Sequence, residues 1–508
     1  MQATPDAPGW FGEISSAEIV SGEPAAASSI CYDSRQVKPG AVFVAVAGLN
    51  VDGHAYIGKA IDAGARSIIV QKGHDESWQP YMAPGLTFIA VPDTRVALAE
   101  AASGFYGNPA RALGMVGVTG TDGKTTTTHL IAHVLSASGL PAGYLSSVEF
   151  SAGGTVERNA THMTTVESPE IQRFLAKMRD GRERYAVTEA SSIGLDMHRV
   201  DQCEFDVGVF TNLAPDHLDY HGTMRAYRDA KAILFRMVDT SRKKGFAKAA
   251  ILNADDPASV ELRSVTGAPV TTYGLHAPAD VTAQDITPEG FGTHFKATML
   301  GREGTATTHL LGDYNVSNCL ASVAVAVSQG APFHDALAAL ASFSGVPGRM
   351  ELLDEGQPFR VVVDIASTEQ SMRNVLRMLR PLTPGNLIVL FGAAGERDTG
   401  RRGGIALAVA EYAEHAVITN EDPRRESPDQ ILDEIAAALQ SAGFGGKFDR
   451  EPDRQAAIKL AFKRARKGDT VLLAGKGTET SIVIGTAHLP WDERQIARKL
   501  LQGAFGGV

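Results

Sequence analysis

The alternation of apolar and polar stretches along this chain predicts a series of α/β regions. Between Ile30 and Val91, the apolar runs AVFVAV, SIIV and LTFIAV are separated by the helical stretch AYIGKAIDAGA. Further along, the runs RYAVTEAS, FDVGVFTN and KAAILNADD each end in polar residues. This arrangement is typical of parallel sheets, in which ligands bind at the carboxyl ends of the strands.

A second doubly wound sheet is predicted after the turn-rich segment FSGVPGRM, near residue 346. Its apolar runs are RVVVDIA, NLIVLFGA, HAVITN and TVLLAG, with helical stretches near 370–380, 403–413, 428–441 and 453–467. Between Val270 and Leu311 the pattern is polar and Gly-rich, which indicates an antiparallel ribbon. We therefore predict an α/β protein with three domains, over residues 1–110, 111–345 and 346–508.

The segment GVTGTDGKTTTTHLIAHVL, from Gly117 to Leu135, predicts a phosphate-binding loop between a strand and a helix. Backbone N–H groups at the start of such a helix point at phosphates. Lys124 would reach the β- and γ-phosphates, and the Thr125 hydroxyl would bind Mg²⁺. Because Val118 stands where the common pattern has glycine, the motif is the narrower T-G-T-x-G-K-T. The expected nucleotide contacts in it are Gly120, Thr121, Gly123, Lys124, Thr125 and Thr126.

Composition narrows the class of protein. A chain of 508 residues is too long for one core, and 44% hydrophobic and 21% charged residues are ordinary for a globular protein. The net charge of −10 argues against a nucleic-acid-binding surface. The three cysteines are far apart, as expected of reduced thiols in a cytosolic protein. With neither a signal-peptide pattern nor an apolar run of membrane-span length, we expect a cytoplasmic location.

An ordered set of motifs resembles the Mur ligase family, and most closely its MurE type. The motifs are DSRQVKPGAVFVAV, TGTDGKTTT, TEASS, TNLAPDHLDYHG, LNADDP, GDYNVSNCLA, PGRME, GERDTGRR and AGKGTE, which span nearly the whole chain. The resemblance implies an ATP- and Mg²⁺-dependent ligase, expected to be monomeric, that adds a diamino acid to UDP-N-acetylmuramoyl-L-alanyl-D-glutamate in peptidoglycan synthesis. A substrate carboxylate would attack ATP to form an acyl phosphate, from which an amine would displace phosphate.

The resemblance also implies domain roles: residues 1–110 would bind the UDP-substrate, 111–345 would bind ATP as a P-loop domain with a mostly parallel sheet, and the Rossmann-like 346–508 would bind the amino acid. Chemistry of this kind requires neutralised phosphate charge and reactants held in line.

By the same resemblance, Lys124, Glu189, His217 and Lys231 form the catalytic set. Glu189, His217 and Lys231 would join Thr125 as metal ligands. Lys231 would be carbamylated, because an ammonium repels Mg²⁺ whereas a carbamate is an anionic oxygen ligand. From spacing alone, a solvated histidine and a helix-surface lysine are the ordinary interpretations of His217 and Lys231. The implied nucleotide contacts outside the loop are Asn315, Arg349 and Asp364.

Three groups of residues match substrate-facing positions of the family. Asp33 and its neighbours would hold the UDP end. For Thr164 and Thr165, an ordinary helix-capping role is almost as well supported by the sequence alone. Hydroxyls and arginines suit phosphate and carboxylate groups. The expected substrate residues are Ser34 and Arg35 for UDP, Thr164, Thr165, Ser191 and Arg199 for the muramoyl-peptide, and Arg397, Glu421, Asp422, Arg424, Gly475 and Glu479 for the amino acid.

The sequence departs from the family pattern at specific places. Ile193 replaces an imidazole after the metal glutamate, and Ile365 and Ser367 replace an aromatic ring and a histidine. In the segment EDPR, Asp422 replaces the asparagine usual in ligases that add meso-diaminopimelate. An anion there would repel that substrate's distal carboxylate, so lysine or ornithine is an alternative, although Arg424 could still pair with a carboxylate.

Two other functions remain open on the sequence. The lost imidazoles allow a catalytically silent Mur-like protein that only binds nucleotide, whereas the retained phosphate and metal set argues for an enzyme. A Mur-like ligase could also act on another carboxylate substrate. The expected partners are the UDP-linked dipeptide and a diamino acid, with no nucleic acid and no membrane span.

Overall fold

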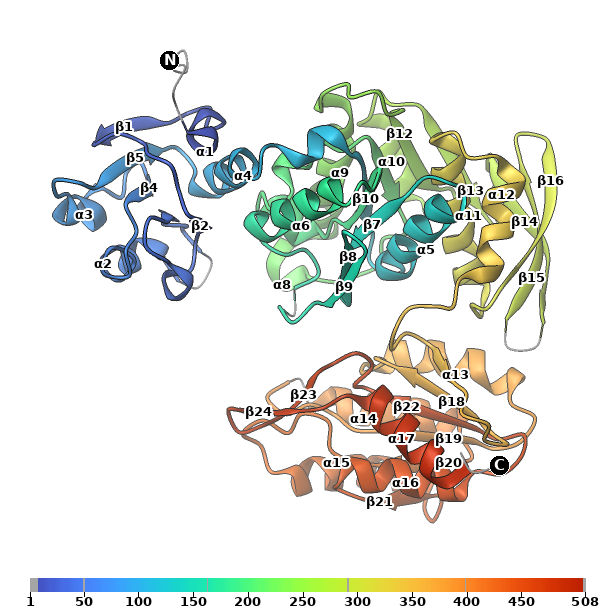
Figure 1. Ribbon diagram of the computed structural model, residues 1–508. Coiled ribbons are helices and arrows are strands. Elements are labelled where there is room, and N and C mark those ends of the chain that lie inside the picture. Colours follow the sequence, from blue (N-terminus) through green and yellow to red (C-terminus); the bar gives the residue numbers. More distant parts are fainter. Residues whose placement is uncertain (1–7, 49–50, 162, 290–291, 398, 506–508) are drawn as a thin grey trace. The chain divides into compact units, whose positions relative to one another are not determined.

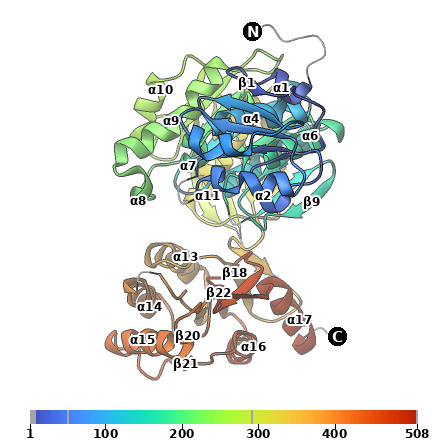
Figure 2. The ribbon, with the colours of Figure 1, turned by 90° about the vertical axis from the view of Figure 1, so that its left-hand side faces the viewer.

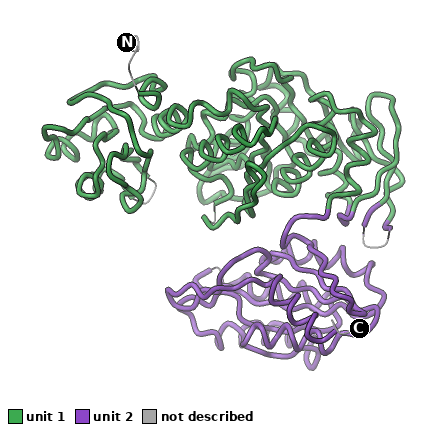
Figure 3. Tube along the Cα trace, viewed as in Figure 1, with its two compact units in different colours: residues 1–287, 294–308, 313–343 green, residues 288–293, 309–312, 344–508 purple. Residues whose placement is uncertain are grey.

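The computed structural model describes residues 8–48, 51–161, 163–289, 292–397 and 399–505. The chain divides into two compact units (Figure 3). Unit 1 is formed by residues 1–287, 294–308 and 313–343, and unit 2 by residues 288–293, 309–312 and 344–508. Among the residues that the structure describes, none of the helices combines the length and apolar character needed to span a bilayer.

Unit 1 begins with a sheet in the order β1-β5-β4-β3-β2, parallel except for the antiparallel pairing of β1 with β5 (Figure 1). Alternate residues of its strands enter two separate cores: Val42 and Ile69 pack on one face with Trp10, and Phe43 and Ile68 pack on the other. The elements are α1 (Gly9–Gly12), β1 (Glu18–Ser21), β2 (Ile30–Cys31), η1 (Ser34–Gln36), β3 (Val42–Val44), η2 (Gly53–Tyr56), α2 (Ile57–Asp62), β4 (Ser67–Gln71), α3 (Asp75–Trp78), η3 (Gln79–Tyr81), β5 (Thr87–Val91) and α4 (Thr94–Phe105).

The larger sheet of unit 1 follows the order β16-β15-β14-β13-β12-β11-β6-β10-β7-β8-β9. Its strands pair in parallel from β14 through β7, and β8 and β9 continue it as antiparallel neighbours. The strands are β6 (Gly114–Thr119), β7 (Ala142–Leu145), β8 (Glu149–Ala152), β9 (Thr155–Arg158), β10 (Tyr185–Glu189), β11 (Val207–Phe210), β12 (Ala249–Asn253), β13 (Val270–Gly274), β14 (Val281–Pro288), β15 (Thr293–Met299) and β16 (Arg302–Thr308).

The expectation of an antiparallel ribbon over Val270–Leu311 is wrong for its first half. Strand β13 pairs in parallel with β12, and β14 in parallel with β13. β13 is only partly buried and β14 has several exposed residues, which allows polar residues in both strands, whereas β6 and β10 are buried throughout.

Helices flank the larger sheet of unit 1 and connect its parallel strands (Figure 1). The helix α5 that follows β6 carries buried Leu130, Ile131, Val134 and Leu135, as the spacing predicts. The helices are η4 (Pro109–Ala112), α5 (Lys124–Ala137), α6 (Ser168–Asp180), α7 (Ser192–Asp196), η5 (Asp201–Cys203), α8 (Leu218–His221), α9 (Met224–Thr240), α10 (Ala258–Ser264), α11 (Asp313–Ser328), α12 (Phe333–Ala339) and η6 (Leu340–Ser342).

Unit 2 contains a sheet in the order β17-β18-β22-β19-β20-β21, in which all neighbours from β18 to β21 run parallel. Helices α13, α14 and α15 cover one face, and α16 and α17 cover the other (Figure 2). The elements are β17 (Glu351–Leu353), β18 (Arg360–Asp364), α13 (Glu369–Leu382), β19 (Leu387–Phe391), α14 (Gly400–Tyr412), β20 (His415–Ile418), α15 (Pro428–Ser441), β21 (Phe448–Arg450), α16 (Arg454–Arg464), β22 (Thr470–Ala474), β23 (Ser481–Ile484), β24 (Ala487–Pro490) and α17 (Glu493–Phe505).

The domain boundaries inferred from the sequence remain predictions. The one at residue 110 falls within η4, inside unit 1. The one after residue 345 lies beside Ser344, where the continuous part of unit 2 begins.

A buried ion pair holds the start of strand β6. Asp206, 1% exposed, accepts a hydrogen bond from the Met115 N–H at 2.9 Å, and its carboxylate lies 3.0 Å from Lys244 Nζ. Lys244 Nζ also donates to the carbonyl oxygens of Ala110 and Glu204. The carboxylate therefore compensates an ammonium that water does not reach, and it anchors the strand that leads to the predicted phosphate loop.

We expect Asp206→Ala to lower the free energy of unfolding by about 3–5 kcal/mol, because it leaves the Lys244 ammonium buried without its counter-ion. The control is Asp62→Ala at the exposed end of α2, which should change stability by less than about 0.5 kcal/mol. Urea unfolding followed by circular dichroism measures both. A loss below about 1 kcal/mol for Asp206→Ala would show that the pair contributes little.

Candidate functional site

The loop between β6 and α5 has the backbone geometry of a phosphate-binding turn. Gly120 has φ 151°, and a Cβ there would lie 1.8 Å from Thr211 Oγ1. Gly123 has φ 80° and forms the N-cap of α5, where a Cβ would lie 2.8 Å from Asn318 Oδ1. Both positions thus require glycine. At Gly120 a side chain would collide with Thr211, and at Gly123 the backbone is left-handed. The first backbone N–H groups of α5 follow directly, as phosphate binding requires.

Two lysine amines converge on one carbonyl oxygen in this loop. Lys124 Nζ donates to Gly120 O at 3.0 Å and to Thr121 O at 2.8 Å, and Lys231 Nζ donates to Gly120 O at 2.8 Å. Lys231 comes from α9, is 1% exposed, and its Nζ lies 4.2 Å from the centroid of the Tyr227 ring. Burial, and then the charge of Lys124, lowers the pKa of Lys231 to about 6. Lys231 is therefore a buried amine that is mostly neutral at pH 7.

Ser147 connects the P-loop to the predicted metal glutamate. Its Oγ lies 2.9 Å from Thr125 Oγ1, and its backbone N–H donates to Glu189 Oε1 at 2.7 Å. Glu189, 1% exposed, ends β10, the strand next to β6. The sequence analysis did not single out Ser147; its one signal is a polar pair directly after β7, which lies beside β10. Thr125 and Glu189, two predicted Mg²⁺ ligands, therefore both contact Ser147.

The residues predicted to meet the muramoyl-peptide adjoin Glu189. Thr165 Oγ1 donates to Glu189 O at 2.9 Å and lies 2.9 Å from Ser191 Oγ, which caps α7. Arg199 NH1 donates to Thr165 O at 2.9 Å, and its Nε lies 2.9 Å from Glu167 Oε1. Thr164 directly precedes this group and is partly buried. The structure therefore brings Thr165, Ser191 and Arg199 together beside the end of β10.

His217 lies at the margin of this arrangement. It has φ 51°, its side chain is 48% exposed, and its Nε2 lies 3.4 Å from Asp216 Oδ2. Its ring centroid is 6.3 Å from that of Tyr227, whose hydroxyl lies 3.2 Å from Thr121 Oγ1. His221, which the sequence analysis did not single out, places its Nε2 3.0 Å from Ser192 Oγ. The structure thus sets two imidazoles near Tyr227, the predicted one being the more exposed.

The predicted base contact, Asn315, lies on α11 near the P-loop helix. Asn318 Nδ2 donates to Asn315 Oδ1 at 3.1 Å, and Asn318 Oδ1 accepts from Thr127 Oγ1 at 3.1 Å. This chain of amide and hydroxyl groups ties α11 to α5.

In the first sheet, the predicted UDP contacts are tied to their own turn. Asp33 caps η1 and accepts bonds from the Arg35 backbone N–H and from its guanidinium, which is 87% exposed. Ser34 is partly buried between them. This ion pair is local and solvated, so the side chain of Arg35 is available to a ligand at little cost.

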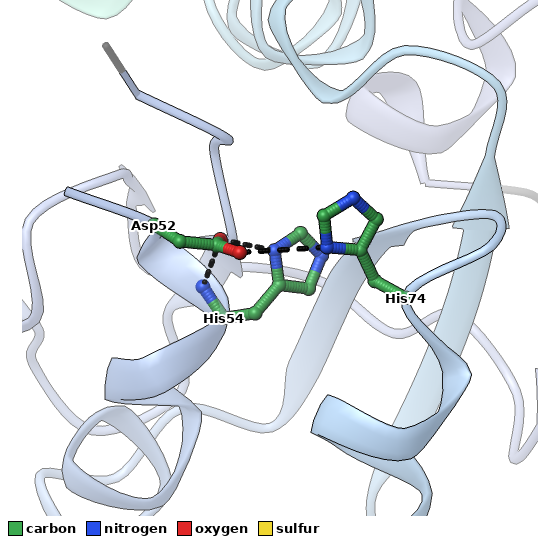
Figure 4. Close-up of side chains that lie close together, drawn as sticks. All are labelled: Asp52, His54 and His74. Atoms are coloured by element: carbon green, nitrogen blue, oxygen red, sulfur yellow. Dashed lines mark hydrogen bonds and ion pairs between the residues drawn. The ribbon is translucent and has the colours of Figure 1, made fainter. Parts of the chain in front are cut away.

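Asp52, His54 and His74 form another cluster in that sheet (Figure 4). His54 Nε2 lies 3.0 Å from the Gln71 N–H and so accepts its hydrogen, which leaves Nδ1 to donate to Asp52 Oδ1 at 2.6 Å. The His74 ring stacks on that of His54 at 4.6 Å with an interplanar angle of 20°. Nearly parallel rings cannot direct both Nδ1 lone pairs at one ion, so this cluster is a brace for the loop before η2 rather than a metal site.

In unit 2, the carboxyl ends of β18, β19, β20 and β22 meet at one edge of the sheet. At the end of β18, Asp364 accepts hydrogen bonds from the Met350 and Ala366 N–H groups, each at 2.8 Å. Burial raises the pKa of Asp364, and the positive charge of Arg349 opposes that rise. Arg349 and Asp364, both predicted nucleotide contacts, therefore lie close together.

The predicted amino-acid residues gather after β20 and β22. Asp422 Oδ1 accepts hydrogen bonds from Lys476 Nζ at 2.8 Å and from the Val483 N–H at 2.9 Å. Lys476 also donates to Glu479. A Cβ on Gly475 would lie 2.9 Å from Glu421 Oε2. Lys476 therefore compensates the negative charge of Asp422. The sequence analysis, which expected this charge to repel the distal carboxylate of diaminopimelate, did not include Lys476.

The two arginines predicted to face the amino acid stand on adjoining loops. Arg424 has φ 54°, and its backbone is bonded to the β23–β24 hairpin through Val483 O and the Gly485 N–H. Arg397 is exposed, and its loop is tied to the Asp422 loop by the Gly395 N–H, which donates to Asp422 O at 2.8 Å.

Known protein families match this chain in three consecutive segments. Residues 27–106 match the profile "Mur ligase family, catalytic domain", residues 118–326 "Mur ligase middle domain", and residues 348–477 "Mur ligase, glutamate ligase domain". A UDP-N-acetylmuramyl-tripeptide synthetase of Roseiflexus sp. (strain RS-1) is 42% identical over 493 residues, covering 94% of this chain and 96% of that protein. The chain belongs to the Mur ligase family.

Other members of the Mur ligase family match over a similar extent. A UDP-N-acetylmuramoyl-L-alanyl-D-glutamate--2,6-diaminopimelate ligase of Geobacillus thermodenitrificans (strain NG80-2) is 40% identical, covering 92% of this chain and 93% of that one. A solved structure of a ligase of the same name matches with a TM-score of 0.67, 27% identity, and coverage of 96% and 97%. The MurF ligase of Thermotoga maritima in complex with ADP has a TM-score of 0.60, 18% identity, and coverage of 94% and 96%, and shares the fold. The predicted fold class is confirmed.

In this Mur ligase, the positions that depart from the family pattern sit beside retained polar groups. Ile193 lies within α7, next to Ser192, the residue that contacts His221. Ile365 and Ser367 follow Asp364 directly at the end of β18. His221 therefore contacts the residue that directly precedes Ile193 in α7.

The lowered pKa of Lys231 predicts a pH dependence of folding. Between about pH 7 and 10 the unfolded chain binds a proton at Lys231 that the folded chain does not, so stability should rise with pH there. Relative to Lys231→Met, the unfolding free energy of the parent should rise by up to about 1.4 kcal/mol per pH unit. Urea titrations of both proteins in CO₂-free buffer measure this difference, and an equal pH dependence would contradict the buried neutral amine.

Proposed function

We propose that this Mur ligase is a MurE-type enzyme that adds a diamino acid to UDP-N-acetylmuramoyl-L-alanyl-D-glutamate with ATP. The names of relatives that are 40% and 42% identical over more than nine-tenths of the chain support this substrate. The observation that carries the proposal is the contact of Ser147 with both Thr125 and Glu189, with Thr165 bonded to the backbone of Glu189. It brings the glycine-rich loop, a buried carboxylate and the Thr165 hydroxyl side by side.

The reaction begins with attack of the substrate carboxylate on the γ-phosphorus, with ADP leaving, to give an acyl phosphate. The neutral amine of the diamino acid then attacks the acyl carbon, loses a proton, and expels inorganic phosphate from the tetrahedral intermediate. Lys124 and the N-terminus of α5 would hold the phosphates and offset their charge. The protein thus acts by positioning and electrostatics and supplies no nucleophile.

The oxygen atoms near Ser147 fit a magnesium ion. Thr125 supplies a hydroxyl and Glu189 a buried carboxylate, and hard oxygen ligands are those that Mg²⁺ prefers. Mg²⁺, when bound there, would neutralise phosphate charge. As an ammonium, Lys231 does not suit such a site, whereas its neutral amine can add CO₂ and release a proton, leaving a carbamate. His217 would be a further ligand of the set.

The remaining site residues divide between the substrates. Thr164, Thr165, Ser191 and Arg199 would hold the muramoyl-peptide, and Ser34 and Arg35 its UDP end. Asn315, Arg349 and Asp364 would contact the nucleotide beyond its phosphates. In this assignment residues 1–110 bind the UDP-substrate, 111–345 bind ATP and 346–508 bind the amino acid. A reaction that uses ATP and a UDP-linked precursor would take place in the cytoplasm.

For the amino acid we propose diaminopimelate. The relative from Geobacillus thermodenitrificans is named for that substrate. Lysine or ornithine was an alternative because the charge of Asp422 would repel a distal carboxylate. Lys476 lies 2.8 Å from Asp422 and offsets that charge, which weakens the case for these two amino acids. Arg424 offers a guanidinium whose Nε has no hydrogen-bond partner among the described residues. A guanidinium is a good match for a distal carboxylate.

Lys124→Ala should lower ligase turnover at least about 100-fold, because it removes a charge that the transferring phosphate needs. The measurement is ADP release with UDP-muramoyl-dipeptide and a panel of amino acids, with Lys243→Ala at an exposed lysine of unit 1 as the control. Turnover within a few-fold of the parent would overturn the nucleotide-site assignment. Absence of ligation by the parent itself, with nucleotide still bound, would favour a catalytically silent protein, while activity with another carboxylate acceptor alone would favour a different ligase.

Lys231→Ala should also abolish ligation, and short carboxylates such as formate or acetate should partly restore it by supplying the anionic oxygen of the carbamate. The Lys231→Met variant is the matched comparison, since its side chain fills the space that the added carboxylate would occupy. Mass spectrometry of the parent under bicarbonate provides the direct readout. A bare ammonium beside bound Mg²⁺ would rule out the carbamate.

A further inference from the structure

Lys476 is a lysine with no exposed surface, set among acidic side chains at the carboxyl edge of the unit 2 sheet. Its Nζ lies 2.8 Å from Asp422 Oδ1 and also donates to Glu479. The two carboxylates come from different loops, Asp422 from the one after β20 and Glu479 from the one after β22. A buried ammonium is stable only when charges of this kind compensate it, so the three side chains form one unit.

Asp422 has a second fixed contact that limits where its charge can point. Its Oδ1 accepts the Val483 N–H at 2.9 Å, and its side chain is 12% exposed. Glu421, next to it, is 6% exposed, and burial raises the pKa of its carboxyl to about 7. Its Oε2 has no hydrogen-bond partner among the described residues. This edge of the sheet therefore collects carboxyl groups from Glu421, Asp422 and Glu479 around a single ammonium.

A nearby arginine, Arg454, opposes the rise in the pKa of Glu421 through its charge, but its own ion pair is with Glu493. Arg454 is 2% exposed and binds Glu493 through Nε and NH2, at 2.9 and 2.7 Å. Its remaining donors go to the carbonyl oxygens of Asn420 and Ala474. Because Glu493 compensates Arg454, Lys476 is the cation that offsets Asp422.

Charge at this edge bears on which diamino acid can bind. The distal end of lysine or ornithine carries an ammonium, net charge +1, whereas that of diaminopimelate carries an ammonium and a carboxylate, net charge zero. A more negative site favours lysine and ornithine and disfavours diaminopimelate. Without Lys476, the group of Asp422 and Glu479 would carry two negative charges instead of one.

We propose that Lys476 determines amino-acid specificity by cancelling the charge of Asp422, so that the site admits a diamino acid with a distal carboxylate. The proposal rests on the function proposed above, in which this edge binds the amino acid. Lys476 acts through Asp422 and is a positioning residue rather than a catalytic one.

The test is a competition assay, in which diaminopimelate, lysine and ornithine compete for one limiting UDP-muramoyl-dipeptide and the products are resolved by mass. The product ratio reports relative kcat/KM and does not depend on how much enzyme is folded. Lys476→Met should shift the ratio towards lysine and ornithine by about ten-fold or more, because it uncovers one buried charge. Lys459→Met, at an exposed lysine of α16, should leave the ratio unchanged.

The double variant Lys476→Met/Asp422→Asn is the decisive control, since it removes both charges and should return the ratio to within about three-fold of the parent. The shift should appear in KM for the amino acid, with KM for ATP unaltered. A merely structural role for Lys476 would lower all three products together and leave the ratio fixed, which would overturn the proposal.

If Lys476→Met does not fold, Asp422→Asn alone still decides the question. It keeps an acceptor for the Val483 N–H and leaves Lys476 paired with Glu479, so the ratio should move towards diaminopimelate. An unchanged ratio would refute the proposal. Failure of the proposed function is a different outcome, since the parent would then ligate none of the three amino acids.

Discussion

Strand β6 is buried along its whole length, and this constraint decides where the polar chemistry of unit 1 can lie. A strand with parallel neighbours on both sides and apolar side chains on both faces offers no polar surface until it ends. The P-loop, the carboxylate of Glu189 and the hydroxyl of Ser147 all follow the carboxyl ends of adjacent strands. The buried Asp206–Lys244 pair secures the opposite end, so the loop is held by a strand anchored in the core.

The convergence of Lys124 and Lys231 on Gly120 O follows from that loop. Burial of the Lys231 amine, and then the charge of Lys124 on the same carbonyl oxygen, lowers the pKa of Lys231 to about 6. The result separates two roles that sequence patterns cannot tell apart. Lys124 would face the transferred phosphate, whereas Lys231 is a buried amine that is mostly neutral at pH 7. The tight turn at Gly120, which excludes any side chain, therefore underlies both.

The sequence predicted those parts of the fold whose signal is local. Helix α5 carried clear periodicity and was found where expected, and strands β18, β19, β20 and β22 of unit 2 matched their apolar runs. The parallel pairing of β13 was missed because its segment is polar and only partly buried, a composition that is also typical of antiparallel strands. Ser147 and His221 were missed because their importance comes from neighbours more than twenty residues away in the sequence. No local pattern records such contacts.

The charge of Asp422 is a further case in which a distant residue decides the interpretation of a sequence position. Read alone, the change from a neutral amide to an anion implies a changed preference for the incoming amino acid. Lys476 lies 54 positions further along the chain, and only folding brings its ammonium to 2.8 Å from the Asp422 carboxylate. A charge in a site acts on a ligand as part of the whole group of charges around it. The quantity that bears on specificity is therefore the sum over Glu421, Asp422, Lys476 and Glu479, and a substitution at one of them is interpretable only when the other three are known.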